Sequence, residues 1–146
     1  MSASNAFETS LLGLIFTNVD AANVGDAAGL QNSAAAGVFW IGLHTADPGE
    51  AGDQTTNETA YTNYARQDEA RDVAQWTVTN NTADNDNAIG YPTCGASGAT
   101  LTHFGLGSAN AAAGNLFLSG ALTASLIVSS GVTPSFAAGA LDITLD

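Results

Sequence analysis

The chain has 146 residues, of which 45% are hydrophobic, so it is long enough for one domain with a sizeable core and is not a disordered chain. Fourteen acidic residues stand against two arginines and no lysine, for a net charge of −12. This charge argues against nucleic acid or an anionic membrane surface as a direct partner, because phosphates would be repelled. We expect neither kind of partner.

Other features of the composition argue against further classes of protein. The single cysteine, Cys94, cannot form an internal disulfide. No stretch approaches the roughly 20 apolar residues of a membrane-spanning helix. The first residues carry no lysine or arginine, which predicts that no secretory signal peptide is present.

Residues 4–17 have the pattern of a short helix. Asn5, followed three residues later by Glu8, resembles a capping box that satisfies the first free backbone N–H groups. An apolar stripe then follows with helical spacing, and we predict it as a partner-binding surface: Phe7, Leu11, Leu14 and Ile15. Packing of this stripe against its own domain is the alternative.

Residues 18–36 are rich in Ala, Gly, Asn and Asp and show no periodicity. Long loops without regular structure are uncommon inside compact domains and are often functional. We therefore divide the chain into an N-terminal helix and extended arm, residues 1–36, and a β domain, residues 37–146.

A strand and a turn follow the arm. The run from Val38 to Leu43 is aromatic and β-branched, typical of a strand that is buried on both faces. Asp47, Pro48 and Gly49 then form a turn, since Pro presets φ and Gly tolerates positive φ.

The rest of the chain reads as further short strands. Trp76–Thr79, Thr100–Gly107, Leu116–Val128 and Leu141–Leu145 alternate or are continuously apolar, and turn residues separate them. About seven or eight strands at this spacing favour an all-β fold, an antiparallel β-sandwich or jelly roll. The predicted core comprises Phe39, Trp40, Ile41, Leu43, Val78, Phe104, Leu122, Leu141, Ile143 and Leu145.

The two arginines are expected to serve local carboxylates. Three acidic residues lie close to Arg66 and Arg71 in the chain, and each arginine is predicted to form an ion pair with one of them: Asp68, Glu69 or Asp72. An anion site is the less favoured interpretation.

No catalytic, cofactor or metal site is predicted. His44 and His103, with Cys94 or Asp47, lack the ligand spacing of a zinc site. The loop at Asp84 and Asp86 has Ile89 and Gly95 at the positions where a calcium-binding EF-hand requires Gly and Glu. A Gly-x-Ser-x-Gly elbow is absent, and the carboxylates are scattered. We therefore expect a protein that is not an enzyme.

Several segments together are similar to a known family. They are Asn5–Phe16, Leu43–Gly49, Tyr64–Arg66, Asn87–Pro92, Leu101–Gly107, Gly114–Thr123 and Ser135–Leu145. In their order and spacing they resemble small virion proteins of tailed phages, often labelled tail fibre proteins, some of which look like capsid decoration (cement) proteins. Residues 18–36 are longer and richer in Ala than that family pattern.

The resemblance implies a structural function. The favoured interpretation is a cement protein on the outer capsid surface of the virion, binding the major capsid protein and itself, with a homotrimer as the expected assembly. The alternative is a tail fibre or baseplate component that binds a host surface receptor. Receptor-binding loops usually present aromatic residues, and here we place Trp40 in the core and Trp76 on a strand.

Overall fold

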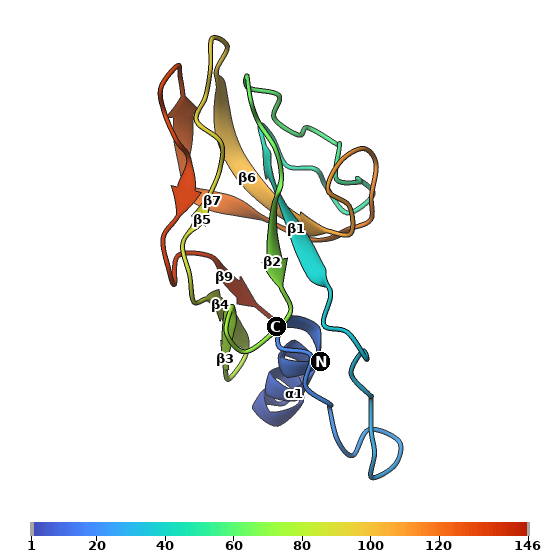
Figure 1. The fold of residues 1–146 in the computed structure, drawn as a ribbon. Coiled ribbons are helices and arrows are strands. Elements are labelled where there is room, and N and C mark those ends of the chain that lie inside the picture. The colour runs from blue at the N-terminus through green and yellow to red at the C-terminus, as the bar shows by residue number, and fades with distance from the viewer. Residues whose placement is uncertain (1, 146) are drawn as a thin grey trace. The chain divides into compact units, whose positions relative to one another are not determined.

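The computed structural model describes residues 2–145 and consists mainly of β-strands (Figure 1). Within these residues there is one helix, α1 (Asn5–Phe16), and there are nine strands. The strands are β1 (Val38–His44), β2 (Gln67–Ala70), β3 (Trp76–Thr79), β4 (Thr82–Asn85), β5 (Ile89–Gly90), β6 (Ala99–Gly107), β7 (Leu116–Val128), β8 (Ser135–Phe136) and β9 (Asp142–Thr144). The predicted all-β class, with antiparallel sheets and a short N-terminal helix, is confirmed. Helix α1, the one helix in residues 2–145, falls short of the length and apolar character needed to cross a membrane.

The described chain forms two compact units, which we describe separately. The helical unit contains residues 1–37, 70–89 and 136–146, and the sheet unit contains residues 38–69 and 90–135. The chain passes between the units more than once, and β5 and β8, which pair with each other, lie at two of these passages. The division into domains after residue 36 stays a prediction.

The sheet unit is built on a four-stranded sheet in the order β2-β1-β6-β7. Strands β1 and β6 are antiparallel, with His44 opposite His103 and Gly42 opposite Gly105. From Phe39 to His44 every residue of β1 except Trp40 is buried, which confirms a strand covered on both faces. The glycines make room for a buried ring, because a Cβ on Gly105 would lie 2.8 Å from His44 Nε2.

The helical unit packs α1 against β3 and β4, and its sheet has the order β3-β4-β9. Leu12 and Phe16 are buried, and the Phe16 ring meets the Trp76 ring edge-on at a centroid distance of 4.9 Å. In β3, Trp76 is buried while Thr77 and Thr79 are exposed, so the predicted alternation of this strand is confirmed. Two segments distant in sequence therefore share one apolar core.

The predicted core is partly confirmed. Six of its members are buried: Phe39, Ile41, Leu43, Phe104, Leu141 and Ile143. The other four are only half-buried: Trp40, Val78, Leu122 and Leu145. Trp40, which was predicted to be largely buried, is only half-buried. Trp76 is 1% exposed, because α1 covers it, and no local pattern in β3 reveals that cover.

The start of the helix also differs by one residue from the prediction. Ser4, and not Asn5, is the N-cap, and its side-chain oxygen accepts a hydrogen bond from the Phe7 N–H. Asn5 is already helical. Both residue types are good caps, so sequence alone does not choose between adjacent candidates.

Candidate functional site

The predicted partner-binding stripe lies on α1 and is partly accessible. Phe7 is 44% exposed, and the other three residues of the stripe, Leu11, Leu14 and Ile15, are half-buried. The fully buried face of α1 is a different one, formed by Glu8, Leu12 and Phe16. The helix therefore uses one face for its own unit and leaves a second apolar face with accessible surface.

Arg71 holds the C-terminal end of this helix. Its guanidinium donates to the carbonyl oxygens of Ile15 at 2.6 Å, Leu14 at 2.8 Å and Ala36 at 3.1 Å. The last carbonyls of a helix have no partner within the helix, and a cation is favoured at that end. A positive charge thus joins α1 to the end of the arm. The prediction for Arg71 named only local carboxylates and did not foresee these three carbonyls.

The arm, residues 18–36, folds back on itself. Ala21 and Leu30 exchange two backbone hydrogen bonds, of 3.0 and 2.9 Å. The Asn18 side chain donates to the Ser33 carbonyl and accepts from the Ser33 N–H, both at 2.9 Å. Asp20 accepts from the Asn32 N–H at 2.7 Å. The arm is therefore a closed loop whose two halves are joined by backbone and side-chain hydrogen bonds.

The sheet unit contains a largely buried ion pair. Arg66 binds Glu58 in a bidentate manner, from Nε to Oε1 at 2.6 Å and from Nη2 to Oε2 at 2.7 Å. The Tyr64 hydroxyl also donates to Glu58 Oε1, and it accepts from the Leu43 N–H. The predicted ion pair of Arg66 with Asp68, Glu69 or Asp72 was wrong: the partner lies eight residues earlier in the chain, in a loop that looked merely solvated.

Burial changes the acid–base properties of the groups around this pair. Burial lowers the pKa of His44, although the hydrogen bond from its ring Nδ1 to the Thr56 carbonyl acts in the opposite direction. Burial also raises the pKa of Tyr64 far above its ordinary value. Both shifts favour the uncharged form, and the Tyr64 hydroxyl holds one oxygen of the ion pair through its hydrogen bond to Glu58.

This buried network holds the loop between β6 and β7 in place. Arg66 donates to the carbonyls of Ala109 at 2.8 Å and Ala112 at 3.0 Å. Gln54 accepts from the Ala109 N–H at 2.8 Å, and its own N–H donates to the Gly114 carbonyl. The hydrogen bonds of Arg66 and Gln54 therefore join two loops of the sheet unit.

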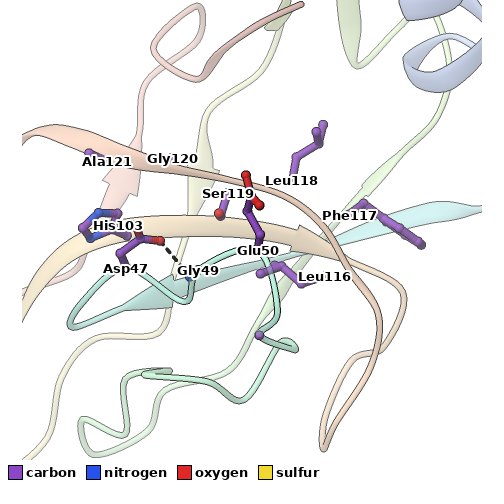
Figure 2. A pocket seen from close by; sticks show the side chains of 11 residues that line it. Asp47, Gly49, Glu50, His103, Leu116, Phe117, Leu118, Ser119, Gly120 and Ala121 are labelled. Atoms are coloured by element: carbon purple, nitrogen blue, oxygen red, sulfur yellow. Dashed lines mark hydrogen bonds between the residues drawn. The ribbon is translucent and has the colours of Figure 1, made fainter.

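A groove of about 610 Å³ lies on the sheet unit, and Figure 2 shows the side chains around it. The exposed carboxylates of Asp47 and Glu50 face the residues of β7 from Leu116 to Ala121, with His103 beside them. One oxygen of Asp47 is used locally, because Oδ1 accepts from the Gly49 N–H at 2.8 Å. The carboxylates of Asp47 and Glu50 suit a ligand with hydroxyl or cationic groups.

Sequence reasoning missed this groove. It treated residues 49–60 as an exposed polar loop and Leu116–Val128 as an ordinary strand. The available signal was the Asp47–Gly49 turn, which bends the loop back, but the strand that it faces is about 70 residues later in the chain.

The histidines and the aspartate considered above as metal ligands have other neighbours in the structure. His44 and His103 lie opposite each other in β1 and β6, and the Nδ1 atom of each is engaged, with Thr56 and Thr102 respectively. Asp84 lies opposite Asp142, and burial followed by this neighbour raises the pKa of Asp84. Across residues 2–145, the His, Cys, Asp and Glu side chains do not gather into any group of three or more that could hold a metal ion.

Comparison with known families identifies the chain at the level of a family. Residues 2–144 match the model of the family described as Podophage GP4 fiber I protein gp80, so the chain belongs to this family of small tailed-phage virion proteins. A search of curated proteins finds no match.

Proposed function

We propose that this member of the podophage fibre protein family is a non-enzymatic structural subunit of a virion fibre. The observation that carries this proposal is the match to a fibre protein over residues 2–144, which covers both units. The polar network around Arg66 and Glu58 agrees with a structural function, because its polar groups hold loops of the same chain.

The attachment surface in this proposal is the stripe of α1 formed by Phe7, Leu11, Leu14 and Ile15. Arg71 and the Ser4 cap hold both ends of the helix, so the stripe is presented on a fixed element. A neighbouring virion subunit that covers the stripe would bury apolar surface at little cost in conformational entropy. The groove lined by Asp47, Glu50 and His103 would then be the surface for a host receptor.

Capsid decoration is the second candidate, and the same stripe favours it. A cement protein must hold the outer capsid surface through contacts with the major capsid protein, and an accessible apolar helix face provides such a contact. The homotrimer expected from the sequence belongs to this candidate, since capsids offer three-fold positions.

Location and copy number in purified virions separate the two candidates. We expect quantitative mass spectrometry to find far fewer copies of this chain than of the major capsid protein. Immunogold labelling with an antibody against this chain should mark the tail, and antibody preabsorbed with the pure protein is the control. Gold distributed over the shell, with a copy number close to that of the capsid protein, would overturn the fibre proposal in favour of decoration. Absence of the chain from virions would overturn both.

A further inference from the structure

Strand β7 is the longest strand described, with 13 residues, and it forms one edge of the four-stranded sheet (Figure 1). Its inner side pairs with β6 from Leu116 to Val128. No strand within residues 2–145 pairs with its outer side. An edge strand presents unpaired backbone N–H and C=O groups, which are a template for another strand.

The side chains of this edge are unusually apolar for exposed positions. Ile127 is 73% exposed and Phe117 51%, and Leu118 and Leu126 are each 38% exposed. Proteins usually protect such edges with lysine, proline, inward-pointing charges or β-bulges. Residues 116–128 contain no charged residue and no proline. Of the usual protections β7 has only irregularities in register, one between the partner positions Leu101 and His103 and one between Leu106 and Gly107.

The distribution of charge indicates which partner fits. Residues 104–141 contain none of the 14 acidic residues and neither arginine. Two copies of a chain with a net charge of −12 repel each other over most of their surface. Strand β7 itself adds no charge, and the exposed carboxylates that line a groove with it, Asp47 and Glu50, face only Leu116 to Ala121, so two copies meet few opposing charges along this edge. A basic partner would be drawn to the acidic surface elsewhere and would gain nothing at this edge. The occupant that fits is therefore a second copy of this chain.

The register defines how two such edges can match. Leu118 lies opposite Leu106, and Ile127 lies opposite Thr100. Leu106 and Thr100 are an even number of residues apart on β6, so they share one face of the sheet, and Leu118 and Ile127 therefore share that face as well. Leu126 lies opposite Leu101 and belongs to the other face.

We propose that the outer edge of β7 pairs antiparallel with β7 of a second copy about a two-fold axis. A two-fold axis normal to the sheet keeps the same face of both copies on the same side. Leu118 then lies opposite Ile127 of the partner subunit, and this apolar pair occurs twice. The irregular residues 122–125 lie near the axis. Each contact is repeated by symmetry, as in the isologous interfaces of most dimers.

Cysteine cross-linking of the full chain tests this register. The Leu118→Cys, Ile127→Cys double variant should form a disulfide-linked dimer under mild oxidation, detected on a non-reducing gel. The matched control is Leu118→Cys with Leu126→Cys, whose thiols lie on opposite faces and should not cross-link above the wild-type background. That background is low because Cys94 is buried. Equal cross-linking by both pairs, or by neither, would overturn the proposed register.

The oligomeric state gives a second and independent readout. Sedimentation equilibrium of the wild-type chain should show a dimer, and Ile127→Asp should weaken dimerisation by about tenfold or more, because two like charges would be buried near apolar partners. Ile127 is largely exposed in one copy, so the circular dichroism spectrum and the melting temperature should not change at low concentration. A wild-type monomer, a trimer, or an undiminished Ile127→Asp dimer would overturn the proposal, whichever virion location is found.

Discussion

Arg66 and Glu58 form a bidentate ion pair in which the arginine side chain is 2% exposed and the carboxylate side chain 16% exposed. The arginine also donates to the carbonyls of Ala109 and Ala112, so the same guanidinium neutralises a buried charge and fixes a loop. A buried pair of this kind contributes little net stability when intact, but it is costly to break, because the remaining charge has no partner.

Replacing Glu58 by Gln should therefore destabilise the protein strongly. We expect a loss of about 3–5 kcal/mol in the free energy of unfolding, measured by urea denaturation, since Arg66 would stay buried and charged. Asp68→Asn is the matched control, because Asp68 is exposed and its loss should change stability by less than about 0.5 kcal/mol. A Glu58→Gln variant as stable as this control would show that water reaches the pair.

The two tryptophans should differ in their contribution to stability. Trp76→Ala should cost about 3–5 kcal/mol, because it empties a site filled by the ring beside Phe16. Trp40→Ala should cost less, since Trp40 is only half-buried. Urea denaturation of both variants with equal m-values provides the comparison, and the reverse order would contradict the core described here.

The cross-strand pair of Asp84 and Asp142 should limit stability near neutral pH. The two lie opposite each other in β4 and β9, and like charges in such positions are unfavourable. Asp84→Asn should raise the free energy of unfolding at pH 7 by about 0.2–1 kcal/mol. Asp142→Asn should give a similar gain, and the double variant should give no more than either, since one substitution already removes the repulsion.

The pH dependence of this gain follows from the direction of the pKa shift. Burial, and then Asp142, raise the folded-state pKa of Asp84 above its unfolded value. The folded protein therefore takes up the proton first as the pH falls, which relieves the penalty in the wild type. The advantage of Asp84→Asn should be fully present above the folded pKa and should shrink as the pH falls through it. A gain that stays constant down to low pH would exclude this mechanism.

The α1 stripe can be tested separately from folding. A Leu11→Asp, Leu14→Asp double variant should lose incorporation into virions while it keeps its melting temperature within a few degrees, because both residues have accessible surface. Ala6→Asp, at an exposed position of the same helix, is the control for added charge and should be incorporated normally.

A variant on the buried face of α1 shows what a loss of folding, rather than a loss of attachment, would look like. Leu12→Asp places a charge on the buried face of α1 and should destabilise the helical unit itself. If the Leu11, Leu14 double variant behaves like Leu12→Asp, the stripe is ordinary core. If the double variant is incorporated at full occupancy, the attachment surface lies elsewhere.

Local patterns were sufficient for most of the secondary structure. The helix over Asn5–Phe16 and the strands β1, β3, β6 and β7 follow from periodicity and from the turn residues that bound them. Burial of Leu141 and Ile143 followed from alternation along one strand. These features depend on neighbours within a few residues, which sequence displays directly.

The sequence by itself determined the class of fold, the acidic character and the uncharged run through residues 104–141, because composition and short-range spacing carry that information. Only the tertiary structure decided that α1 buries Trp76, that Arg71 holds the end of this helix, that Arg66 pairs with Glu58, and that β7 is an edge. Each of these depends on which distant segments meet. Strand order and long-range hydrogen-bond partners are set by the packing of the whole chain, because many local patterns are compatible with more than one arrangement.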